Sequence, residues 1–224
     1  MHFSNESLYK KARKNRDLNF DRRNKEYYQN IEDYDWVKVI NEFSGLESFY
    51  HKIREIISLN YIKPFIFRKR IKIVDAGCGT GLILRHLPKN AIGVDMNPRH
   101  LKRAKKYAPH CKFLLADIEK IPVRSSSVDL ILCFETIEHI LFPERILREL
   151  RRLLVKNGVL IGSVPNRSLL WRLRRFSSTH PHDELFHREF SKHELISLLG
   201  RDFIIEEMQN KILGMNFFFR CRKK

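Results

Sequence analysis

A glycine-rich turn that follows a short apolar run is the feature that most constrains this chain. Residues 73–81 read I-V-D-A-G-C-G-T-G, with glycine at three alternate positions. Glycine in such a turn allows positive φ and lets the backbone approach a ligand closely. A buried strand that leads through this turn into a helix predicts an open α/β sheet with a ligand at the carboxyl end of that strand. Dinucleotide-binding loops need G-x-G-x-x-G, whereas here the third glycine comes one residue early and Leu82 stands in its expected place.

Apolar runs alternate with helical stretches along most of the chain, which predicts a parallel sheet covered on both faces. The predicted strands are Ile71–Ala76, Ala91–Val94, Lys112–Ala116, Val128–Phe134 and Val159–Val164, and the predicted helices between them are Pro98–Tyr107 and Pro143–Leu154. Two final runs, Phe203–Met208 and Met215–Cys221, have a short connection and indicate an antiparallel hairpin. The expected fold class is therefore α/β, a doubly wound, mostly parallel seven-stranded sheet with an antiparallel edge hairpin.

The 224 residues carry a net charge of +17 that is spread along the chain. Such charge could attract nucleic acid or an anionic membrane surface, or only keep a lysine-rich protein in solution. No apolar run reaches the roughly 20 residues that span a bilayer. Since Met1–Arg23 also lacks a signal-peptide core, we expect a cytoplasmic protein without a transmembrane segment. The four cysteines have no metal-binding spacing and are expected to be reduced.

The first 60 residues differ from the rest. Residues 1–30 are rich in Lys, Arg and Asn, so part of them is expected to be disordered. In the stretch that follows, apolar residues recur at helical spacing, which predicts one or two helices that pack against another element. These residues are Val37, Ile40, Phe43, Phe49, Ile53, Ile56 and Ile57.

Two acids stand at the ends of the next predicted strands. Asp95 ends the second strand, where a carboxylate can accept hydrogen bonds from both hydroxyls of a ribose. Asp117 follows the third strand and could accept from an adenine amino group, while Met96 and Ile118 could sandwich the ring. Alternatively, both acids only cap the following loops.

In this order, D-A-G-C-G-T-G, G-V-D-M-N, L-L-A-D-I, V-D-L-I-L-C-F-E and L-L-V-K-N-G-V-L-I make residues 71–166 resemble the class I methyltransferase family. The resemblance implies that S-adenosylmethionine is the cofactor. It implies a methionine site at Asp75, Gly77, Gly79 and Gly81, a ribose site at Asp95, and an adenine site at Asp117 and Ile118. Phe134, at the end of the fourth strand, would line the methyl-donor end.

The string after the fourth strand is Glu135-Thr136-Ile137-Glu138-His139. Its E-x-x-E-H pattern resembles the ubiquinone-type O-methyltransferases and related small-molecule enzymes, as do S-V-P-N at 163–166 and H-R-E-F-S at 187–191. Enzymes that methylate the amino groups of adenine and cytosine carry an Asn/Asp-Pro-Pro-aromatic motif here, and this chain does not.

Three interpretations of that string stay open. In the first, His139 is a general base, or orients one, with Glu135, Glu138 and His187 as further candidate catalytic residues. In the second, Glu135, Glu138 and His139 bind a divalent metal with His182 or His187 as a fourth ligand. In the third, Glu138 and His139 only cap the loop.

The resemblance divides the chain into a basic, helical extension (1–60) that covers the acceptor site and a methyltransferase domain (61–224) with a lid-like insertion (167–190). Leu169–Phe176 in this insertion mixes apolar residues with arginines and could touch a membrane or an amphipathic substrate. We expect methylation of a small-molecule or lipid-like acceptor, at oxygen. The alternatives are a metal-dependent RNA 2′-O-methyltransferase and a non-catalytic cofactor-binding regulator.

Overall fold

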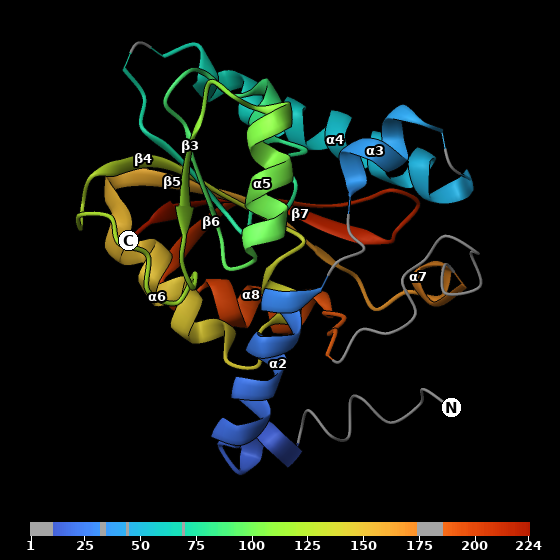
Figure 1. Ribbon diagram of the computed structural model, residues 1–224. Helices are drawn as coiled ribbons and strands as arrows, with labels where there is room; N and C mark the ends of the chain where they lie inside the picture. Colours follow the sequence, from blue (N-terminus) through green and yellow to red (C-terminus); the bar gives the residue numbers. More distant parts are fainter. Residues whose placement is uncertain (1–10, 32–34, 44, 69, 174–185) are drawn as a thin grey trace.

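A computed structural model describes residues 11–31, 35–43, 45–68, 70–173 and 186–224 (Figure 1). A seven-stranded sheet with the order β3-β2-β1-β4-β5-β7-β6 runs through it. The strands are β1 (Ile73–Ala76), β2 (Ile92–Asp95), β3 (Lys112–Leu115), β4 (Val128–Phe134), β5 (Leu154–Pro165), β6 (Phe203–Lys211) and β7 (Asn216–Lys223). The first five pair in parallel, and β7 pairs antiparallel with both β5 and β6. The predicted fold class is confirmed.

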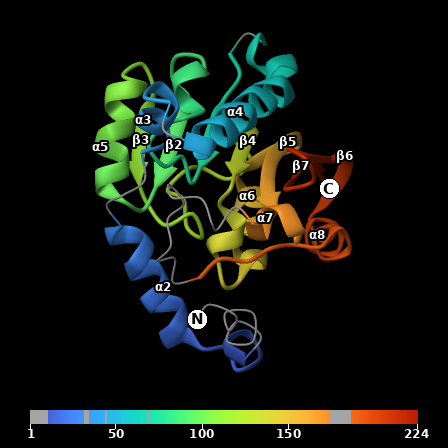
Figure 2. The ribbon, with the colours of Figure 1, turned by 90° about the vertical axis from the view of Figure 1, so that its right-hand side faces the viewer.

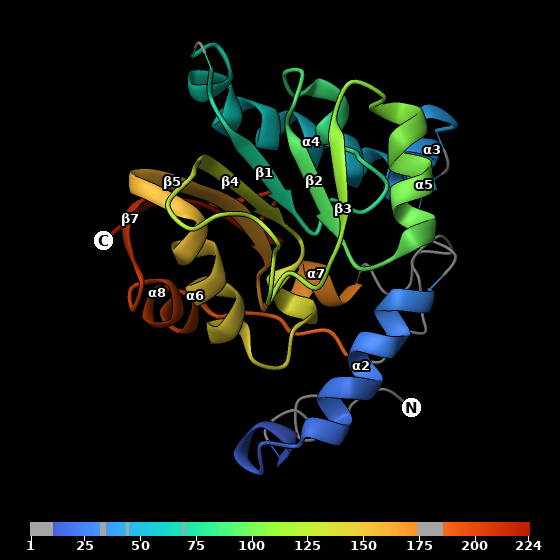
Figure 3. The same ribbon diagram turned by 60° about the vertical axis from the view of Figure 1, so that its left-hand side comes forward.

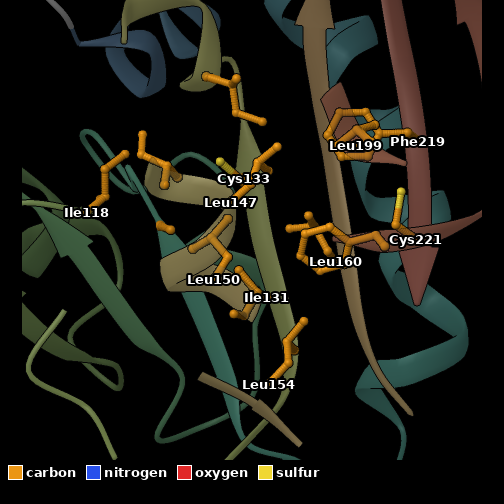
Figure 4. Close-up of a cluster of buried hydrophobic side chains, with 14 of the residues drawn as sticks. Ile118, Ile131, Cys133, Leu147, Leu150, Leu154, Leu160, Leu199, Phe219 and Cys221 are labelled. Carbon is orange, nitrogen blue, oxygen red and sulfur yellow. The ribbon is translucent and has the colours of Figure 1, made fainter. Parts of the chain in front are cut away.

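Helices cover both faces of the sheet (Figure 3). Helices α3 (Trp36–Asn41), α4 (Gly45–Ile66) and α5 (Pro98–Tyr107) share one buried cluster with the sheet, and α6 (Pro143–Leu153) and α8 (Lys192–Leu199) share the other. Figure 4 shows the second cluster, where Leu147 and Leu150 of α6 pack on Ile131 of β4. Each fully buried Leu or Ile stabilises the fold by about 1.5–3 kcal/mol.

The predicted boundaries differ most at β5. The apolar pattern predicts a strand from Val159 to Val164, but β5 begins at Leu154, directly after α6. Asn157 has a φ of +62° and a register shift occurs opposite it between Val128 and Leu130. The polar residues at this irregular start of the strand break the apolar run, so the sequence pattern misses it.

The prediction of a helix directly after the glycine turn is wrong. Only a short 3-10 segment, η1 (Leu84–His86), lies between β1 and β2. Leu87 is extended, with a ψ of 159°, and precedes Pro88, which disfavours helical backbone in the residue before it. The helical turn therefore ends after three residues, and the chain passes at once into β2.

The N-terminal segment carries a helix that its composition did not reveal. Helix α2 (Leu18–Asn30) begins at Asp17, whose side chain accepts a hydrogen bond from the Phe20 backbone. It lies below the sheet and projects from the rest of the molecule (Figures 1 and 3). A short helix, α7 (Leu169–Leu173), follows β5. None of the helices in the described ranges is long and apolar enough to cross a membrane.

Candidate functional site

The glycine turn after β1 has the open backbone that the sequence predicts. Gly77, Gly79 and Gly81 all have positive φ, at +77°, +51° and +88°. A Cβ on Gly77 would lie 2.5 Å from the Thr136 side chain, whereas a Cβ on Gly79 would meet no atom within 4 Å. Strand β2 holds the turn in place, because the backbone N–H groups of Gly77 and Cys78 donate to Val94 O at 2.8 and 3.0 Å. Gly79 therefore presents its backbone to open space.

Two acids lie at the base of this turn. One oxygen of Asp95 accepts from the Gly79 N–H at 2.8 Å, and the other accepts from the Asn97 N–H at 2.8 Å. Asp75 is buried, with 3% of its surface exposed. Burial, and next the charge of Asp95, raise the pKa of Asp75 to about 7.

A cavity of about 560 Å³ opens beyond Asp95, between the ends of β2 and β3 and helix α2. Its sheet side is formed by Met96, Leu115, Ala116 and Asp117, and its α2 side by Leu18, Asp21, Arg22, Lys25, Glu26 and Gln29. Met96 and Asp117 were predicted from the sequence to hold an adenine. Ile118 is 7% exposed and belongs to the buried cluster of Figure 4.

Lys25 of α2 contacts the predicted adenine acid, and sequence reasoning missed it. Its Nζ lies 2.8 Å from both Asp117 Oδ2 and Glu119 Oε2. Arg145 donates to Asp21 of the same helix at 3.1 Å. Asp117 Oδ1 also accepts from the Glu119 N–H, yet a carboxylate has about four acceptor positions, so it can take a further donor.

The E-x-x-E-H string divides into two parts. Glu135 has a φ of +48°, and its carboxylate accepts from Ser163 Oγ at 2.6 Å and from Asn216 Nδ2 at 3.0 Å. Tyr50 Oη of α4 lies 3.3 Å from the same carboxylate. Glu135 thus ties β4 to β5, β7 and α4.

Glu138, His139 and His187 come together on the other side. One ligand atom of each lies within 4.8 Å of the others, a spacing that could hold a metal ion, and Glu135 does not belong to this group. Glu138 is 1% exposed, while the other two are partly exposed. Trp171 of α7 stacks on His187, with ring centroids 5.5 Å apart. His182, the other predicted fourth ligand, lies outside the described residues.

The two hydrogen bonds of the Tyr28 hydroxyl, on α2, define the tautomer of His139. Tyr28 Oη donates to the Phe186 carbonyl at 2.6 Å and lies 2.8 Å from His139 Nδ1. A phenol has one proton and a carbonyl can only accept, so in neutral His139 the proton is on Nδ1, and Nε2 is basic. Nε2 lies 3.9 Å from Glu138 Oε1. No periodicity in the sequence points to Tyr28, since its partner is 111 residues away.

Phe134 lies at the end of β4, partly buried, with its ring 6.4 Å from that of Phe218. It packs against the buried cluster that α3, α4 and α5 share with the sheet, at the expected end of the strand. Residues 174–185 of the predicted insertion lie outside the described residues.

Comparison with known proteins matches residues 74–162 to a family described as "Methyltransferase domain". A Mycobacterium tuberculosis protein named as a probable S-adenosylmethionine-dependent methyltransferase is 30% identical over 131 residues, 57% of this chain and 46% of the relative. A Coxiella burnetii ubiquinone biosynthesis O-methyltransferase is 31% identical over 119 residues, 50% of this chain and 51% of the relative. The chain thus spans about half the length of these relatives.

A crystal structure from Thermotoga maritima, described as an S-adenosylmethionine-dependent methyltransferase and possible histamine N-methyltransferase, has the same fold. It superposes with a TM-score of 0.63 at 24% sequence identity, covering 85% of this chain and all of the other.

Proposed function

Because residues 74–162 form a methyltransferase domain of the class I, S-adenosylmethionine-dependent family, we propose that this chain methylates a small-molecule or lipid-like acceptor at an oxygen atom. The observation that carries the proposal is that the candidate groups follow the carboxyl ends of neighbouring parallel strands. The open glycine turn, Asp95 and the cavity at Asp117 lie on one side of β4, and the Glu138, His139 and His187 group lies at its end.

The residues around the glycine turn fit S-adenosylmethionine. Gly79 faces open space, so its backbone can lie against the methionine part, with Asp75, Gly77 and Gly81 forming the turn. Asp95 would hold the ribose, and Met96 and Asp117, which line the cavity, would hold the adenine, with the buried Ile118 behind them. When bound, S-adenosylmethionine supplies a methyl group on a positively charged sulfur.

His139 would act on the acceptor. A hydroxyl becomes a good nucleophile when a base takes its proton, and His139 Nε2 is the basic nitrogen of this side chain. The hydroxyl proton would move to Nε2, and Glu138, with its Oε1 at 3.9 Å, would stabilise the resulting imidazolium. Helix α2 and helix α7 would exclude water from the acceptor.

A divalent metal at Glu138, His139 and His187 is the second candidate arrangement. Carboxylate and imidazole ligands suit several divalent ions, and the three groups already lie within 4.8 Å of one another. Such an ion would bind the acceptor oxygens and lower the pKa of the hydroxyl. Glu135 would not take part, because its carboxylate is bonded to Ser163 and Asn216.

Calorimetric binding of S-adenosylmethionine and S-adenosylhomocysteine, with and without magnesium, tests the proposal. We expect micromolar binding that Asp95→Ala weakens at least about tenfold, because a charge-assisted contact is lost. Asp129→Ala, at an acid far from the turn, is the matched control. Absence of binding by folded protein would contradict the donor site.

Turnover assays would then separate the acceptors. A catechol-type diol should be methylated, and His139→Ala should reduce turnover far more than donor affinity. Methylation of an RNA oligonucleotide in preference to diols would instead support the RNA alternative. Donor binding without turnover on either would support a regulatory role.

A further inference from the structure

The first half of helix α4 exposes apolar side chains and buries polar ones, whereas its second half buries Tyr61, Ile62 and Phe65 against the sheet. Polar and charged side chains point inward: Glu47, Ser48, His51, Arg54, Glu55 and Ser58 are all 9% exposed or less. The opposite side, which we call the outer face of α4, consists of Leu46, Phe49, Ile53 and Ile56, exposed by 75, 55, 43 and 49%. Spacings of three and four residues place these four on a single stripe.

The inward polar residues fix this orientation. Glu55 accepts hydrogen bonds from Arg85 Nε at 3.0 Å and pairs with His86 at 2.8 Å. Tyr50 donates to Asn216 of β7 at 2.9 Å. A rotation that buried the apolar stripe would break these bonds and leave buried charges unpaired, which is costly. The sequence pattern predicted that Phe49, Ile53 and Ile56 pack against another element, but in the described residues they stay 55, 43 and 49% exposed.

The apolar surface extends beyond both ends of the helix. Phe43 is 64% exposed and packs edge-to-face on Phe49, with ring centroids 5.1 Å apart. Phe67 is 77% exposed just past the C-terminus. The outer face runs from Leu46 to Ile56, about 15 Å along the helix axis, so it is longer than an isolated surface residue. Extended apolar patches of this kind mark contact surfaces.

The exposed charges of α4 and of the residues that follow it are all basic, while Glu42, before the helix, pairs with Lys38. Lys52 and Lys63 are the exposed charged residues of α4, and Arg68 and Arg70 follow it. Both acids of the helix, Glu47 and Glu55, are 1% exposed. A second copy of the chain would bring these like charges together in a protein that already carries a net charge of +17.

We propose that the outer face of α4 docks on the surface of an anionic lipid bilayer, with its apolar side chains inserted among the acyl chains. An apolar stripe flanked by lysine and arginine is the composition of helices that lie in the plane of a membrane interface. The basic residues would contact anionic headgroups, whose attraction falls off within a Debye length.

Helix α4 contacts the acceptor side of the site through its inner side, opposite the outer face. Tyr50 of α4 packs on Trp171 with ring centroids 5.9 Å apart, and Trp171 stacks on His187. Figure 2 looks onto the side of the molecule that carries α3, α4 and α7. If the proposed acceptor is lipid-like, docking through α4 would bring the acceptor entrance close to the bilayer that holds it.

Vesicle flotation tests the docking. The full chain should float with vesicles of phosphatidylcholine and phosphatidylglycerol, and at least about tenfold less with phosphatidylcholine alone or at high salt. Phe49→Ser combined with Ile53→Ser should reduce anionic vesicle binding at least about tenfold, because both side chains lose apolar area. The matched control is Ile196→Ser with Ile204→Ser, exposed by 43 and 54% on α8 and β6, and it should float like the native chain.

A charge variant, Lys63→Gln with Arg68→Gln, leaves the apolar stripe unchanged and should also lower anionic vesicle binding. It keeps the test decisive if the serine variant fails to fold. Donor binding by calorimetry on the same samples reports folding, so loss of docking and loss of the donor site are distinguished. Equal flotation of native chain and both variants would overturn the proposal. So would a dimer that the serine variant dissociates in sedimentation, or RNA binding that replaces vesicle binding.

Discussion

The buried carboxyl group of Asp75, in the candidate site, makes the stability of the fold depend on pH. Asp75 lies near the end of the fully buried strand β1, and burial together with the charge of Asp95 raises the pKa of its carboxyl to about 7. The unfolded carboxyl titrates near 3.8. Since the folded state binds this proton more tightly, the stabilising effect of protonation is present below pH 3.8 and is lost as the pH rises through 7.

We therefore expect Asp75→Asn to make the fold more stable at neutral and alkaline pH. Thermal unfolding should give similar midpoints for the two proteins near about pH 4 and a midpoint several degrees higher for the variant near about pH 8. Asp202→Asn, at a partly exposed carboxylate paired with Arg151, is the control and should not show this pH dependence. A difference independent of pH would contradict the interpretation of Asp75.

Tyr28 is a positioning residue for His139, by the hydrogen bonds described above. Tyr28→Phe should lower kcat about tenfold and broaden the pH profile, because Nδ1 loses its partner and the imidazole can adopt the other tautomer. Donor affinity should stay the same. Nitrogen NMR of His139 should show the Nδ1-protonated form in the native chain and a mixture in the variant.

Tyr107→Phe removes a phenol that donates to Asp35 at 3.2 Å, far from His139, and is the matched control. An unchanged tautomer in Tyr28→Phe would show that other contacts orient the imidazole.

At the scale of the element, α2 is held over the cavity by charges and polar contacts. Lys25 and Asp21 connect the helix to Asp117, Glu119 and Arg145, and Asn97 donates from the loop after β2 to the carbonyls of Tyr28 and Ile31. The helix has few aliphatic residues of its own. Besides the packing of Phe20 on Phe186, its position over the cavity therefore depends on ion pairs and hydrogen bonds.

Lys25→Met should loosen α2. The substitution removes two ion pairs and leaves Asp117 and Glu119 close together without their shared cation. Hydrogen exchange of the Leu18–Asn30 amides should become several-fold faster, while the sheet stays protected. Arg22→Met, which removes only an exposed pair with Glu26 at 3.9 Å, is the control. Unchanged exchange in both variants would mean that the hydrogen bonds of Asn97 suffice.

At the scale of the whole molecule, the site joins segments far apart in the chain. The glycine turn, the β4 end, α2 and the residues around His187 each supply one part. A ligand that bridges these parts should stabilise the fold as a unit, because it binds the folded state alone.

S-adenosylmethionine at a concentration of about 100 times its Kd should stabilise the protein by about 2.7 kcal/mol and raise Tm by several degrees. Gly79→Val should abolish the shift, because a side chain there would fill the space that the donor occupies. Gly214→Val, at the β6–β7 turn, matches the backbone strain, with a φ of +86°, and should keep the ligand-induced shift. An equal shift in the Gly79 variant would exclude this turn as the donor cradle.

The sequence by itself determined the order of the strands along the chain, the glycine turn and the acids at the strand ends. These features depend on a few neighbouring residues: apolar runs, glycine spacing and the polar residues that end a strand. They can therefore be recognised in the sequence alone. Only the tertiary structure shows that Glu135 is bonded away from Glu138 and His139. It also places Lys25 and Tyr28 at the candidate site, and it decides which side of α4 faces outward. Each of these depends on partners that are far away in the chain, 92 and 111 residues for Lys25 and Tyr28, and local periodicity carries no information about such contacts.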